Sequence, residues 1–91
     1  MEDKEQNNPF TERRVGKFIV HSTVINHGPY DKLMQFMSNF LVVRAEHMWV
    51  QAGIEYTAYS RLFGVTDEGE MVPEYKVIVG EDESLSVRRI A

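Results

Sequence analysis

The spacing of the hydrophobic positions changes along this chain, and each change marks a different predicted element. Residues 15–25 are dense in β-branched and aromatic side chains of both parities, which is typical of a strand covered on both faces. A second segment, from Pro29 to Phe40, is predicted to be a helix, with Gly28 as its N-cap and Asp31 in its first turn. Its apolar side chains recur at the spacing of one helix face and are expected to pack on a sheet: Leu33, Met34, Phe36, Met37, Phe40 and Leu41.

The period then shortens to two. Residues 42–63 alternate in polarity around Ala52-Gly53, and they predict a β-hairpin whose loop has two or four residues. Both loop lengths give the same parity, and we expect the helix to cover the face formed by Val43, Ala45, His47, Trp49, Tyr56, Ala58 and Leu62.

The C-terminal part predicts two more strands, at residues 74–79 and 85–90, after a loop at 64–73. Arg88 and Arg89 are typical of an edge strand. The expected fold class is α+β: a small antiparallel or mixed sheet of about five strands, in the order β-α-β-β-β-β, with one helix on a face. A strongly curved, barrel-like sheet with the helix at one end is the alternative.

We expect residues 13–91 to form a single domain, preceded by a mobile N-terminal arm at residues 1–12, which are polar and lack hydrophobic periodicity. The 91 residues are 43% hydrophobic, which is typical of a folded protein. The chain lacks cysteine and an apolar leader segment, and Arg44 and Glu46 interrupt its longest apolar run. These features predict a cytoplasmic protein that does not enter a membrane.

The net charge of −4 is concentrated in one part of the chain. Acids and bases balance over residues 1–65, whereas residues 66–83 carry Lys76 against Asp67, Glu68, Glu70, Glu74, Glu81, Asp82 and Glu83. Nucleic acid is not an expected partner, because phosphate binding depends on Lys and Arg.

Motifs that carry catalysis or cofactor binding are missing from the sequence. There is no nucleophile elbow and no glycine-rich phosphate loop, and His21, His27 and His47 do not have metal-ligand spacing. We predict no catalytic residue, metal or cofactor. An enzyme that pairs His47 or His21 with a carboxylate as acid and base would need a contact made only in the fold.

The polar face of the hairpin suggests an anion site. With a two-residue turn, Arg44 lies directly opposite Arg61, with Tyr59 nearby. Either a carboxylate such as Glu46 or solvent neutralises the two guanidinium groups, or they bind an anion. A four-residue loop would make the arginines diagonal neighbours.

We expect a non-catalytic interaction module: a small regulator or inhibitor, of the kind that phages and mobile elements encode, which binds a protein partner. Its candidate partner surface consists of Trp49, Tyr56, Asp67, Glu68, Glu70 and Glu74, although the two aromatic residues are alternatively buried in the core. Self-association into a homo-oligomer would complete the core of so small a domain. The alternative is a sequestering or sensing protein that binds an anionic nucleotide or metabolite through Arg44, Arg61 and Tyr59.

Overall fold

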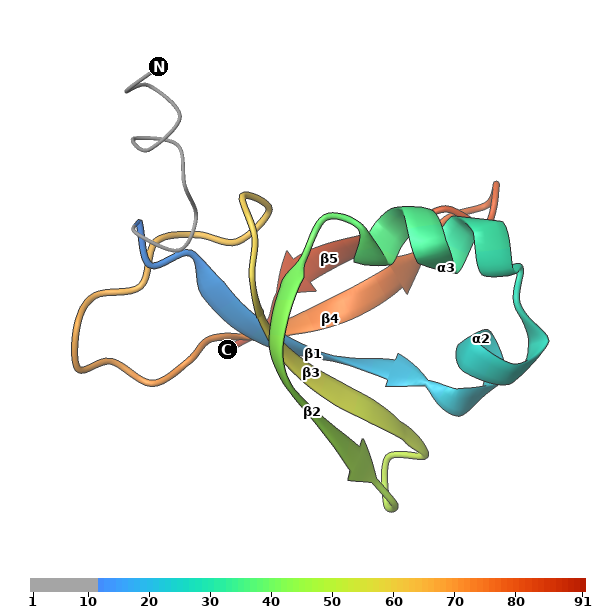
Figure 1. The fold of residues 1–91 in the computed structure, drawn as a ribbon, viewed down its shortest axis with the longest axis horizontal. Coiled ribbons are helices and arrows are strands. Elements are labelled where there is room, and N and C mark those ends of the chain that lie inside the picture. The colour runs from blue at the N-terminus through green and yellow to red at the C-terminus, as the bar shows by residue number, and fades with distance from the viewer. Residues whose placement is uncertain (1–11) are drawn as a thin grey trace.

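The structure is a computed structural model, and it describes residues 12–91. The elements of this part of the chain are β1 (Val15–His21), α2 (Ser22–His27), α3 (Tyr30–Met37), β2 (Leu41–Met48), β3 (Gly53–Tyr59), β4 (Glu74–Val79) and β5 (Leu85–Arg89) (Figure 1). The strands form one sheet in the order β2-β3-β1-β4-β5. Strand β1 is antiparallel to β3 and parallel to β4, and the other pairs are antiparallel.

This mixed sheet with helices on it confirms the predicted α+β class. In the described residues the sheet has two edges, β2 and β5, so it is not a closed barrel, and the prediction of an edge strand at β5 is confirmed. The predicted N-terminal arm lies outside the described residues except for Glu12, whose carboxylate accepts a hydrogen bond of 2.7 Å from the Arg14 guanidinium.

Helix α2 occupies a segment that the sequence pattern assigns to the first strand. The strand ends at His21, whose side chain accepts a hydrogen bond from the backbone N–H of Thr23 and so caps the helix. Val24 and Ile25 then pack against the core from a helical backbone. The β-branched residues favour a strand, but this tertiary packing decides the conformation.

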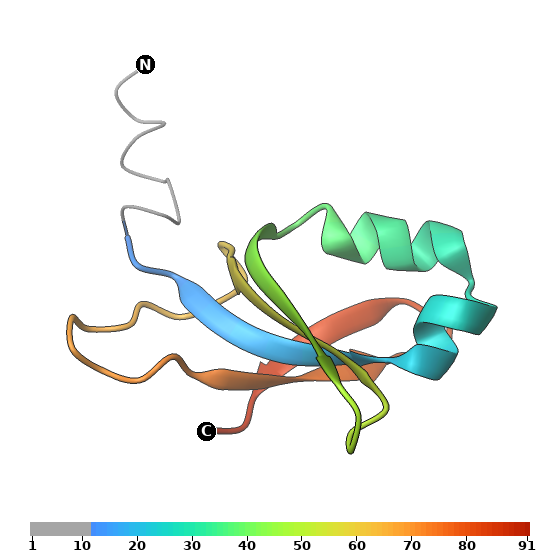
Figure 2. The ribbon, with the colours of Figure 1, turned by 60° about the horizontal axis from the view of Figure 1, so that its bottom comes forward.

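Helix α3 begins at Tyr30, with Pro29 as its N-cap, and ends at Met37, so it is shorter than predicted. It packs over β5 and the core on β1 (Figure 2). The prediction that it covers the hairpin formed by β2 and β3 is therefore wrong for β2. Ala45 and His47 of β2 are exposed. The sequence pattern does not reveal that β1 and β4 lie between this hairpin and β5, and the twist of the sheet turns β2 away from the helix.

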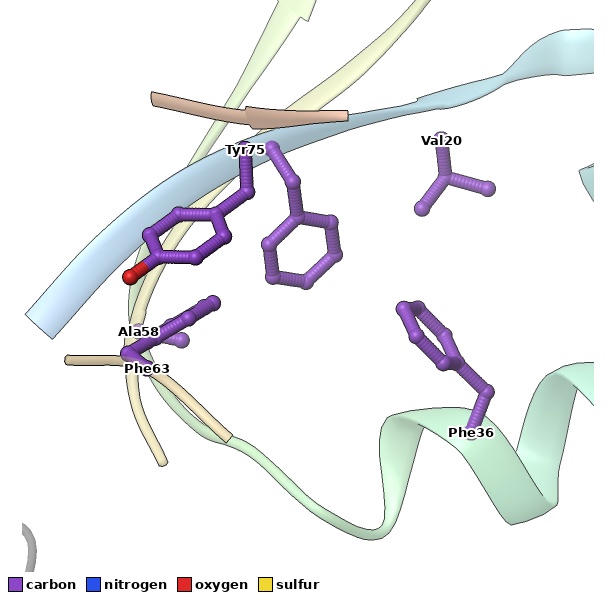
Figure 3. Close-up of a cluster of buried hydrophobic side chains, with 6 residues drawn as sticks. Val20, Phe36, Ala58, Phe63 and Tyr75 are labelled. Carbon is purple, nitrogen blue, oxygen red and sulfur yellow. The ribbon is translucent and has the colours of Figure 1, made fainter. Parts of the chain in front are cut away.

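The core consists of buried side chains from the sheet, from α3 and from the loop after β3. They are Phe18, Val20, Phe36, Ala58, Phe63 and Tyr75 (Figure 3). The Phe18 ring lies in the middle, with centroid distances of 4.7 Å to Phe40 and 5.7 Å to both Phe36 and Tyr56. Of the predicted apolar stripe of the helix, Phe36 is buried in the core, whereas Met34 is 70% exposed.

Strand β3 ends at Tyr59 and does not continue to Phe63 as predicted. The Ser60 N–H donates to the Arg14 carbonyl at 2.9 Å, and the Phe63 N–H donates to the Ser60 carbonyl at 3.1 Å. This turn directs Phe63 into the core, where its ring centroid lies 4.4 Å from that of Tyr75. The loop from Ser60 to Pro73 then leads into β4.

Of the four strand pairings in the sheet, the one between β1 and β4 has the fewest paired residues. Two residue pairs join these strands, Lys17 with Glu74 and Phe18 with Tyr75. The strands then diverge, and a shallow groove of about 270 Å³ lies between them, with Ile19 and Lys76 in its lining.

Candidate interaction surface

Helix α3 lies over one face of the sheet, and α2 follows the end of β1 (Figure 2); we call the other face, which no helix covers in residues 12–91, the open face. At one edge of this sheet, β2 is exposed along almost all of its length. Its first residues are apolar, with Leu41 57%, Val42 38% and Val43 52% exposed. We define the β2 surface as Leu41–Met48 together with Trp49 and Val50, the first two residues of the following turn.

The turn between β2 and β3 presents two large apolar side chains to solvent. Trp49 is 83% exposed and Val50 is 93% exposed. The Trp49 indole meets the His47 imidazole edge-on, with centroids 4.1 Å apart and an interplanar angle of 89°. The Ala52 carbonyl accepts a 2.8 Å hydrogen bond from the Ser22 N–H, which attaches the turn to the start of α2. The backbone of the turn is therefore anchored while its apolar side chains remain accessible.

The turn comprises Trp49–Ala52 rather than Ala52-Gly53, and the reason lies in the packing of Gly53. This residue begins β3 and pairs with His21 of β1. A Cβ atom at position 53 would lie 2.5 Å from the Val20 carbonyl oxygen, so only glycine fits there. Gly53 thus serves a close approach of two strands, whereas the sequence suggests a turn residue.

The observed register changes the charge pattern of the hairpin. Arg44 lies opposite Thr57, and Arg61 follows the end of β3, so the direct opposition of Arg44 and Arg61 is wrong. The like charges that face each other are Glu46 and Glu55. The Arg44 guanidinium donates a 3.2 Å hydrogen bond to the Glu46 carboxylate.

The other predicted site residues lie in different places. Tyr59 is the last residue of β3, opposite Leu41. Tyr56 is partly buried against Phe18, so it does not share an exposed patch with Trp49. Glu74 begins β4 and lies 3.7 Å from the Lys17 ammonium.

Apart from Glu74, the acidic residues of segment 66–83 form two separate groups. Asp67, Glu68 and Glu70 lie in the loop after β3, and Trp49 lies at the other end of that strand (Figure 1). Seven residues of strand separate these sites by roughly 20 Å. The remaining acids, at 81–83, lie in the turn beyond the far end of β4. The predicted partner surface is therefore not continuous in the fold.

One carboxylate in the turn after β4 has a shifted pKa. Asp82 accepts hydrogen bonds from the hydroxyl of Ser84 at 2.6 Å and from its backbone N–H at 3.1 Å. The hydroxyl, then the N–H, and more weakly the charge of Lys32 lower the pKa of Asp82 below its ordinary value of 3.8. These bonds are local and organise the turn.

Two of the histidines, His21 and His47, have structural contacts. The Nδ1 atom of His21 lies 2.9 Å from the Thr23 hydroxyl, and His47 contacts Trp49. Across residues 12–91, no histidine is bonded to a carboxylate, and no group of three or more potential metal ligands occurs. No helix in that range is both long and apolar enough to cross a membrane.

The sequence interpretation missed Val50 and the apolar start of β2 as exposed positions. The signal that could have found them is the pair Val42-Val43, which interrupts the alternation of the strand. The pairing register shifts between Val42 and Arg44, where β2 forms a bulge.

Comparison of the chain with protein-family models, curated proteins and solved structures found no match.

Proposed function

We propose that this chain is a non-catalytic interaction module, a small regulator or inhibitor that binds a protein partner through the β2 surface. The observation that carries the proposal is the exposure of Trp49 and Val50, 83% and 93%, at the end of an exposed edge strand. Buried tryptophans dominate the energetics of many protein interfaces, because they remove a large apolar area from water while ordering few torsions.

Two further features support a protein as the ligand. An edge strand presents backbone N–H and C=O groups that an extended segment of another chain can pair with. Beside these groups the β2 surface offers both apolar and charged side chains, Leu41 and Val43 next to Arg44 and Glu46. A protein strand can match both kinds of group at once.

A photo-crosslinking amino acid at position 50, introduced in the native cell, tests this proposal. We expect crosslinked products that mass spectrometry identifies as protein, and we expect Trp49→Ser to reduce their yield at least about tenfold, which is the loss typical of an interface anchor. The matched control carries the same amino acid at Glu81, which is also exposed but lies in the turn between β4 and β5. Equal products from both positions, or products that Trp49→Ser leaves unchanged, would contradict the proposal.

A further inference from the structure

We propose that the β2 surface binds a second copy of this chain, through antiparallel pairing of two β2 strands about a two-fold axis at Ala45. This inference rests on the proposed function, because it names the occupant of the same surface. Pairing of this kind would join the two sheets into one continuous sheet with both open faces on the same side.

The edge strands of the sheet differ in their suitability for self-pairing. Strand β2 has eight residues and carries both signs of charge, at Arg44 and Glu46. Strand β5 has five residues and carries Arg88 and Arg89 without an acid. A symmetric contact repeats every residue twice, so it needs complementary charges within one strand, and β2 provides them.

The register follows from the faces of β2. Residues opposite each other in an antiparallel pair share a face, so a two-fold axis must pass through a residue of the regular segment 44–48. An axis at Arg44 brings two guanidinium groups together, and an axis at Glu46 brings two carboxylates together. An axis at Ala45 instead places each Arg44 opposite Glu46 of the second copy, and it leaves two small alanine side chains at the centre.

The charge around Glu46 favours the same register. Glu46 and Glu55 are directly opposed in the hairpin, with Arg44 as the cation bonded to Glu46. In residues 12–91, Glu55 has no ion pair of its own. The dimer brings the Arg44 of the second copy beside this acidic pair, so each carboxylate pair gains a second cation.

The register also covers the exposed apolar residues. In each half of the symmetric contact it brings residues 41–43, the exposed start of β2, near His47 and Trp49 at the far end of β2 in the second copy. Leu41, Val43 and Trp49 are 57%, 52% and 83% exposed in the single chain. The bulge after Val42 limits the length of the regular ladder between the two β2 strands. The interface therefore buries less surface than the about 1,200–2,000 Å² of stable complexes, and the dimer dissociates on dilution.

Sedimentation equilibrium of the full chain over a concentration series to about 1 mM tests the proposal, since small interfaces of this kind dissociate in the micromolar range or above. We expect the mass to rise from 10.6 kDa to twice that value. Arg44→Glu and Glu46→Arg should each stay at the monomer mass, because either change opposes like charges. An equimolar mixture of the two variants should regain the dimer mass, because each supplies the charge that the other lacks. Arg88→Glu, the same change on β5, should behave as the wild type.

Recovery in the mixture also shows that both variants are folded. A wild-type mass that stays at 10.6 kDa throughout, or a mixture that does not recover, would overturn the dimer. Neither result affects the proposed function, because the crosslink at position 50 identifies a different protein equally well. Crosslinks that do not depend on Trp49 would contradict the proposed function, whatever mass is measured.

Discussion

Trp49 and His47 lie two residues apart and contact each other edge to face, with ring centroids 4.1 Å apart. Residues i and i+2 share a face of a strand, so this contact extends the geometry of β2 into the turn. The imidazole therefore restricts the rotation of an indole that is 83% exposed.

Removal of the imidazole should release the indole. In His47→Ala we expect lower fluorescence anisotropy of Trp49, the single tryptophan of the chain. Unfolding free energy should change by no more than about 0.5 kcal/mol, because the side chain is exposed. Binding at the β2 surface should weaken about 2–10-fold, the cost of ordering one more side chain. His27→Ala at the end of α2 is the control, and an equal loss of anisotropy there would contradict the role of His47.

The close approach at Gly53 should make this position intolerant of any side chain. A Cβ atom there would lie 2.5 Å from a backbone oxygen of β1, which cannot move without displacing the strand. We expect Gly53→Ala to lower the unfolding free energy by about 1–3 kcal/mol in denaturant titration. At Gly64 the nearest atom to a new Cβ is 3.9 Å away, so Gly64→Ala should be neutral or stabilising by up to about 1 kcal/mol. Similar losses in both variants would refute this explanation.

Phe18 should be among the most sensitive positions in the core. Its side chain is 1% exposed, and its ring has four aromatic neighbours: Phe36, Phe40, Tyr56 and Phe63. Phe18→Ala should cost about 3–5 kcal/mol, a large part of the 5–15 kcal/mol typical of a whole domain. Val65→Ala, at a residue 54% exposed, should change the stability by less than about 0.5 kcal/mol. Thermal unfolding of the two variants measures the difference, and similar midpoints would be inconsistent with this core.

The Asp82 carboxyl should titrate below its ordinary pKa of 3.8, because the Ser84 hydroxyl and N–H stabilise its charged form. A pKa lowered in the folded state contributes stability above pH 3.8, and this contribution disappears as the pH falls through the lowered pKa. Ser84→Ala removes the hydroxyl and should raise the pKa of Asp82 toward 3.8. NMR titration of the side-chain carboxyl carbon of Asp82, in the wild type and in Ser84→Ala, measures the shift. An unchanged midpoint would rule out the hydroxyl as its cause.

The sequence predicted the strands and the central helix well because their signals are local. The spacing of Phe36 and its neighbours is that of a helix face, and the residues of β4 and β5 have the composition of strands. The failures concern distant partners. Ser22–His27 is helical because Val24 and Ile25 reach the core, and no local pattern reveals that contact.

The candidate site was predictable in its residue types but not in its geometry. Trp49 near the hairpin tip and Arg44 on the polar face were both found from the pattern. The register was not, because Gly53 resembles a turn glycine and its close contact with β1 exists only in the fold. The observed register of β2 and β3 separates Arg44 from Arg61 and places Glu46 opposite Glu55.

Only two residue pairs join β1 to β4 in the described part of the chain, and this weak pairing has a consequence for partial unfolding. Strands β4 and β5 are joined by five pairs, and β1 and β3 by seven, so hydrogen bonding divides the sheet into two units. Side chains across this boundary, such as Phe18 and Tyr75, hold the units together. Partial unfolding should therefore release β4 and β5 as one cooperative unit. In hydrogen–deuterium exchange their amides should share one opening free energy, lower than that of the amides between β1 and β3.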